Sequence, residues 1–252
     1  MVVDIDWRIG KDEVPFHRYM MLALPGVGNV GKLIVDSLVE KLPSNLVARI
    51  HHSELPPHAM MSSGLLIPPH LGLHSVELDE ETTILVVCGE NQPMTASGQY
   101  ELSMSIIEIA KSLNTELLMV LAGLSSEAGS EEVHLVLSDD STKSKIEDMG
   151  IPISIDEPKG GVIGVAGLVS SMSSIKSVNS CCIVAETFGT SVDMVAAERL
   201  KLQLEKWFNI DLPINIDETS KLVERIKEMY SPELGRELSQ EMMSQTDNTF
   251  YQ

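Results

Sequence analysis

The fold is decided by the stretch from Tyr19 to Leu42, YMMLALPGVGNVGKLIVDSLVEKL. It opens with an apolar run, Tyr19–Leu24, whose length is typical of a buried strand. A glycine-rich turn follows, and apolar residues then recur at helical spacing. The charged residues of this helix fall on the opposite face: Lys32, Asp36 and Glu40. Strand, tight turn and helix form the first part of a βαβ unit, so the stretch predicts a sheet covered by helices.

The turn spells G-x-G-x-x-G through Gly26, Gly28 and Gly31. In a dinucleotide-binding unit such glycines let the backbone approach a pyrophosphate at the helix N-terminus, and an acid after the second strand holds the ribose. The second strand is expected at Leu46–Ile50, but two histidines follow it and the nearest acid is Glu54. The pattern therefore favours a structural glycine loop, in which the three residues permit a sharp turn and close helix–strand packing.

The composition excludes some classes of partner. The 252 residues carry a formal net charge of −19, which repels nucleic acid and anionic lipid. No cationic leader opens the chain and no apolar run reaches the roughly 18 residues of a membrane span. Cys88, Cys181 and Cys182 lie in apolar runs without metal-knuckle spacing, which predicts buried, reduced thiols. We expect a cytoplasmic protein with no nucleic acid or membrane partner.

The rest of the chain alternates strand-like and helix-like segments. An edge strand is expected within residues 1–18. Further strands are predicted at 74–78, 83–88, 116–122, 132–137 and 180–185, and helices at 100–113, 143–149, 165–175 and 193–208, with Asp193 as the N-cap of the last. The rhythm is typical of one α/β domain over residues 1–230, followed by a C-terminal helix and a flexible tail over residues 231–252.

No pattern in the sequence predicts a catalytic centre. The G-x-S-x-G elbow and the H-E-x-x-H zinc motif are both absent. Glu186, beside Thr187 at the end of a strand, is the best single catalytic candidate, and we interpret it as a solvated acid. The histidines of the proline-rich loop 51–74 lack helical ligand spacing, so packing or surface roles are favoured. We expect no enzyme activity, no cofactor and no metal.

The C-terminus carries the most specific pattern. A helix is expected at 219–230, and the polar run Ser244–Thr249 leads to Phe250-Tyr251-Gln252 with its free carboxylate. This ending resembles the hydrophobic–Tyr–any-residue motif by which proteasome-associated factors dock between α-subunits of the 20S core particle. The aromatic ring offers contact area with few rotors to order, and the carboxylate can pair with a lysine in a pocket.

Three blocks of the body resemble the proteasome assembly chaperone 2 family and its archaeal members. They are PGVGNVG (25–31), GGVIGVAGLV (160–169) and CCIVAETFGTSVDMVAAERL (181–200). The resemblance covers roughly residues 18–230 and implies a three-layer α/β/α sandwich with a mixed, largely parallel sheet, plus C-terminal helices and the flexible tail. It also implies a non-catalytic homo-oligomer that binds 20S proteasome α-ring subunits. AETFGTSVD departs from the family's more usual aromatic and Asp-Pro run at that position.

Three hypotheses of function follow. The first is a proteasome assembly chaperone or core-particle binding factor that docks through Phe250, Tyr251 and Gln252. The second is a nucleotide- or nucleoside-binding α/β enzyme that uses the Gly26–Gly31 loop. The third is a scaffold for an unrelated partner, in which the ending FYQ has no role.

Overall fold

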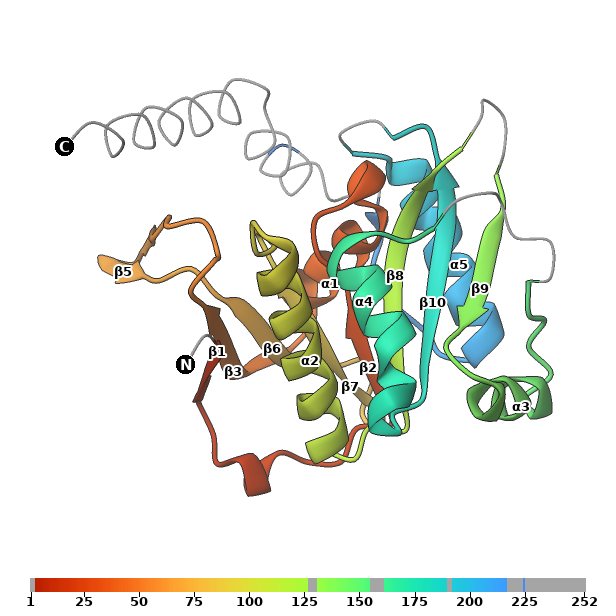
Figure 1. Cartoon of the computed structure of the whole chain (residues 1–252), viewed down its shortest axis with the longest axis horizontal. Helices are drawn as coiled ribbons and strands as arrows, with labels where there is room; N and C mark the ends of the chain where they lie inside the picture. The colour runs from red at the N-terminus through yellow and green to blue at the C-terminus, as the bar shows by residue number, and fades with distance from the viewer. Residues whose placement is uncertain (1–2, 127–130, 155–160, 190–191, 217–223, 225–252) are drawn as a thin grey trace.

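The computed structural model describes residues 3–126, 131–154, 161–189, 192–216 and 224. They form a sheet with helices on both faces and a separate two-stranded hairpin (Figure 1). The strands are β1 (Val3–Trp7), β2 (Tyr19–Leu22), β3 (Ser44–His52), β4 (Met60–Ser62), β5 (Leu65–Ile67), β6 (Leu71–Glu77), β7 (Thr83–Gly89), β8 (Leu117–Ser125), β9 (Val133–Leu137) and β10 (Ser180–Thr187). The main helices are α1 (Val30–Lys41), α2 (Ala96–Ser112), α3 (Asp140–Asp148), α4 (Gly164–Met172) and α5 (Met194–Phe208).

The main sheet has eight strands in the order β1-β3-β6-β7-β2-β8-β10-β9. The four central strands, β7, β2, β8 and β10, pair in parallel. The remaining pairs are antiparallel: β1 with β3, β3 with β6, β6 with β7, and β9 with β10. The predicted mixed sheet is therefore confirmed, and its parallel part is the centre, where helical crossovers connect the strands.

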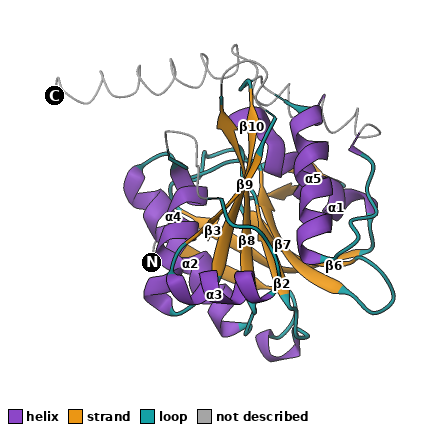
Figure 2. Ribbon diagram, turned by 90° about the vertical axis from the view of Figure 1, so that its right-hand side faces the viewer, coloured by secondary structure: helices purple, strands orange, loops and turns teal. Residues whose placement is uncertain are grey.

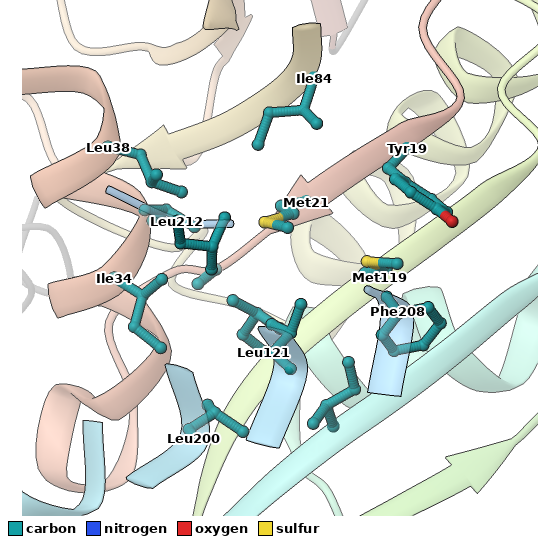
Figure 3. Close-up of a cluster of buried hydrophobic side chains, with 14 of the residues drawn as sticks. Tyr19, Met21, Ile34, Leu38, Ile84, Met119, Leu121, Leu200, Phe208 and Leu212 are labelled. Carbon is teal, nitrogen blue, oxygen red and sulfur yellow. The ribbon is translucent and has the colours of Figure 1, made fainter. Parts of the chain in front are cut away.

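Two apolar cores lie on the two faces of the sheet, so the molecule has three layers (Figure 2). On one face Met21 and Leu121 pack against α1 and α5, with Ile34 and Leu200 from these helices in the same cluster (Figure 3). On the other face α2 and α4 cover Met20 and its neighbours. Because alternate residues of a strand point to opposite faces, the unbroken apolar run of β2 serves both cores. The predicted α/β/α sandwich is confirmed.

Capping residues set several helix starts. Asp193 accepts a hydrogen bond from the amide of Ala196 at 2.9 Å and begins α5, as predicted. Helix α2 begins four residues before the expected Tyr100, because the Thr95 hydroxyl accepts from the amide of Gly98 at 3.1 Å. The same cap geometry at Asp139 begins α3 earlier than expected. The expected edge strand is β1, which pairs with β3.

Two of the three charged residues that the sequence places opposite the apolar stripe of α1 are buried. Nine consecutive residues of α1, Val30–Leu38, are buried, including Lys32 and Asp36, whereas Glu40 is exposed. The segment after α5 covers the helix: Leu212 is fully buried in the same core. The tertiary partners of Lys32 are the Gly89 carbonyl and Glu90 at the end of β7, and periodicity within α1 could not reveal them because they lie far away in the sequence.

The predicted helix at 219–230 and the tail at 231–252 lie outside the described residues, residue 224 apart. Within the described part, none of the helices combines the length and apolarity that a bilayer crossing requires.

Candidate functional site

The glycine turn joins β2 to α1 through left-handed backbone. Gly28 has φ 62° and Asn29, the N-cap of α1, has φ 48°. A Cβ on Gly28 would lie 2.8 Å from the hydroxyl oxygen of Thr187. A Cβ on Gly31 would overlap the carbonyl of Leu121, so its absence lets α1 lie directly on β8. Gly26 is different, because its backbone is extended and a Cβ there would meet only the Leu24 carbonyl at 3.8 Å.

A hydrogen-bond network holds the turn against the end of β10. The Thr187 hydroxyl donates to Oδ2 of Asp193 at 2.6 Å, and the amide of Asp193 donates to the carbonyl of Gly28 at 2.8 Å. Asp193 therefore caps α5, fixes the end of β10 and orients the glycine turn at once. This network lies in the AETFGTSVD segment, in which the structure does not describe residues 190–191.

Gln92 connects the glycine turn to the start of α4. Its Nε2 donates to the carbonyl of Pro25 at 2.6 Å, and its Oε1 accepts from the amide of Val165 at 3.1 Å. The role of Gln92 is not visible in the sequence, because a single glutamine in a loop carries no recognisable pattern. The link closes one side of a cleft at the carboxyl end of β2 and β8.

The cleft has a volume of about 640 Å³, within the range of small-molecule sites. Its walls are the 22–31 segment, the 120–125 segment and the 161–166 segment, with Gln92 and Gln99 as side-chain amides. None of these lining residues is charged. Phosphates bind beside cations or helix N-termini, and riboses bind beside acids. The described lining offers the N-termini of α1 and α4, side-chain amides and apolar contact, but no charged side chain.

Lys32, in the first turn of α1, is paired with carboxylates outside the cleft. Nζ of Lys32 lies 2.7 Å from Oδ2 of Asp36 and 3.0 Å from Oε2 of Glu90, and it donates to the carbonyl of Gly89 at 3.2 Å. Burial by itself lowers the pKa of Lys32, but the two carboxylates outweigh it and raise that pKa above its ordinary value. Lys32 stays charged and ties α1 to the end of β7.

Glu186 is not the solvated strand-end acid that the sequence suggested. It is buried, and its Oε1 lies 3.3 Å from Nε2 of His134, which is also buried. The backbone of Glu186 is held as well: its amide donates to the carbonyl of Glu132, and its carbonyl accepts from Nη2 of Arg199 at 2.6 Å. The neighbouring strand β9 pairs antiparallel with β10 and supplies His134 beside the carboxylate. Neither the Glu186–His134 pair nor the Thr187–Asp193 pair includes the nucleophile–base–orienter set that covalent catalysis uses.

In the described residues, the surroundings of the histidines and cysteines indicate structural roles rather than metal binding. Nδ1 of His51 lies 3.0 Å from the carbonyl of Pro69, and no cluster of three or more metal-ligating side chains is found in the described ranges. Cys181 and Cys182 are fully buried, and burial raises the pKa of the Cys182 thiol to about 11. Cys88 is half-buried rather than buried, and none of the three cysteines, all described, forms a disulfide.

Of the predicted site residues, the structure places only the glycines. Phe250, Tyr251 and Gln252 lie outside the described residues. The described part thus defines an α/β/α protein with an uncharged cleft at the carboxyl end of its parallel strands.

The chain belongs to the PAC2 family, whose model matches residues 20–231. This is the family that the three sequence blocks resemble. An uncharacterised protein of Methanocaldococcus jannaschii is 26% identical over 224 residues, which are 87% of this chain and 84% of that protein.

Two solved structures from Pyrococcus furiosus share the fold. PbaA, described as an archaeal homolog of proteasome-assembly chaperone, superposes with a TM-score of 0.70 at 20% identity, over 93% of this chain and 99% of PbaA. PbaB, described as an archaeal proteasome activator, superposes with a TM-score of 0.71 at 19% identity, over 94% of this chain and 99% of PbaB.

Proposed function

We propose that the protein is a non-catalytic proteasome assembly chaperone or 20S core-particle binding factor of the cytoplasm, archaeal in type. The observation that carries the proposal is membership of the PAC2 family over nearly the whole domain. The descriptions of PbaA and PbaB as a chaperone homolog and a proteasome activator support it.

Within this proposal, the residues that dock are Phe250, Tyr251 and Gln252, which follow a polar run that is part of the proposed tail, 231–252. The nine residues 244–252, when extended, span up to about 30 Å, which is enough for the terminus to enter a pocket between two α-subunits. The Tyr251 ring would fill the pocket and the carboxylate of Gln252 would pair with a lysine at its base. A homo-oligomer would present several tails, and linked tails bind far more tightly than single ones.

The test is a pull-down of purified archaeal 20S α-rings with the full chain and with variants of its last residues. A chain ending at Thr249 and a Tyr251→Ala chain should lose binding. Gln252→Ala is the matched control, because any residue satisfies the last position of the motif, and it should bind as the full chain does. Addition of one alanine after Gln252 should also abolish binding, because it displaces the carboxylate while keeping every side chain.

Two outcomes would reject the tail model. If the chain ending at Thr249 binds as well as the full chain, the body does the recognising. If a peptide of the tail fails to compete with the full chain for the α-ring, the third hypothesis, an unrelated partner, gains support. Circular dichroism of each variant shows that lost binding is not lost folding.

The enzyme hypothesis keeps one favourable observation, the volume of the cleft beside the Gly26–Gly31 loop. The lining disfavours it, because the residues that the structure describes around the cleft give a nucleotide neither a cationic side chain nor an acid for the ribose.

A further inference from the structure

The hairpin formed by β4 and β5, residues 60–67, is a projecting apolar arm. It leaves the body between β3 and β6 and stands apart from the main sheet (Figure 1). Ser63 and Gly64 form its tip with φ values of 50° and 78°, the left-handed geometry of a tight hairpin turn. Its large side chains face solvent: Met61 is 87% exposed and Leu66, its cross-strand partner, is 72% exposed, with Met60 and Leu65 also exposed. Two short strands are marginally stable alone, so such an arm is typical of a surface that a partner covers.

The arm lies in a long uncharged stretch. Residues 55–76 contain no Asp, Glu, Lys or Arg, although these residues make up 22% of the chain. In a chain of net charge −19, this is where a second, equally acidic copy meets the least repulsion. A basic partner would gain more from the acidic surfaces elsewhere, so the absence of charge favours another copy of this chain.

A complementary groove runs along α4, between the start of α2 and β9. It has a volume of about 760 Å³, and its lining is mostly apolar and contains no charged residue. Ile163, 83% exposed, and Tyr100 lie on it from α4 and α2, and Val136 and Leu137 lie on it from β9. Flexible Met and Leu side chains suit such a groove, because they adapt to its shape.

The arm and the groove belong to opposite ends of the sheet order. The arm joins β3 and β6, near one edge, whereas the groove includes β9, the other edge strand (Figure 1). We propose that the arm of one copy inserts into the α4 groove of the next copy. A contact between two different surfaces is head-to-tail, and it forms a closed ring when the rotation closes. The proposal supplies the self-association that the proposed function assumes, and its test contains no core particle, so the two proposals fail separately.

The test is the mass of the purified full-length chain by light scattering over a range of concentrations. Three double variants each introduce two glutamates at exposed apolar positions. The arm variant is Met61→Glu with Leu66→Glu, and the groove variant is Tyr100→Glu with Ile163→Glu. The control variant, on α5, is Val195→Glu with Leu202→Glu, at positions 73% and 55% exposed. We expect an oligomer for the wild type and the control, and a monomer for the arm and groove variants.

Mixing the arm variant with the groove variant separates this contact from others. One intact arm and one intact groove remain in the mixture, so we expect a one-to-one heterodimer from two monomeric proteins. A wild-type chain that stays monomeric, or an arm variant that keeps the wild-type mass, overturns the proposal. A monomeric arm variant beside an unaffected groove variant also overturns it, because that pattern indicates arm–arm pairing.

Discussion

Nζ of Lys32 lies 2.7 Å from Oδ2 of Asp36 within α1, and the lysine side chain has no exposed surface. Glu90, at 3.0 Å from the same nitrogen, completes the charge balance from the end of β7. A buried cation with two carboxylates is stable only while its partners remain, because each group has lost its hydration.

Lys32→Met should therefore destabilise the protein by about 3–5 kcal/mol, since it removes the cation from beside the buried carboxylate of Asp36. Urea unfolding at pH 7 measures the change. The double variant Lys32→Met with Asp36→Leu should recover part of the loss, because Glu90 is partly exposed and can be hydrated. If Lys32→Met is as stable as the wild type, the ion pair does not contribute to the stability of the fold.

Gly31→Ala should destabilise the protein by about 1–3 kcal/mol, because the new Cβ would overlap the Leu121 carbonyl and push α1 off β8. Gly26→Ala is the control, since its backbone is extended and its surroundings are open. Its effect should stay within about 0.5 kcal/mol. Thermal unfolding of both variants compares the two glycines, and equal losses would contradict the structural reading of Gly31.

Stability should fall as the pH drops from about 6.5 to about 4. Burial is the main cause that lowers the pKa of His74 to about 4, and the charge of His70 adds to it. Between these pH values the unfolded chain binds a proton that the folded chain does not. The contribution of His74 to the free energy of unfolding is therefore fully present above pH 6.5 and is lost as the pH falls. The loss from His74 alone is about 3 kcal/mol.

His74→Leu should reduce this pH dependence, and urea unfolding at pH 4.5 and pH 7 measures it. The slope should not vanish, because burial also lowers the pKa of His17 and of His70. An unchanged slope in His74→Leu would contradict the assignment. His58→Gln, on an exposed loop, is the matched control.

Calorimetry with NAD, ATP and nucleosides should give no saturable heat, because the cleft beside the glycine turn has no charged lining. A thermal-shift series with the same ligands should show no stabilisation. Saturable binding of any of them would revive the enzyme hypothesis for the Gly26–Gly31 loop.

The sequence alone determined most of the elements and, at some of them, the local ends. The apolar run of β2, the turn and the periodicity of α1 are encoded in one stretch, so the βαβ start was predictable without any distant contact. The Asp193 cap was predictable for the same reason, because a capping side chain acts within its own first turn.

The tertiary structure alone decided which polar groups are buried. Lys32 is buried where α1 packs against the end of β7, with its Nζ beside the Gly89 carbonyl and the Glu90 carboxylate, and the buried Glu186 lies beside His134 of the neighbouring strand β9. The Gln92 link likewise joins segments far apart in the chain. Local patterns specify local hydrogen bonds and periodicity, whereas the burial of a charge depends on which distant element packs over it.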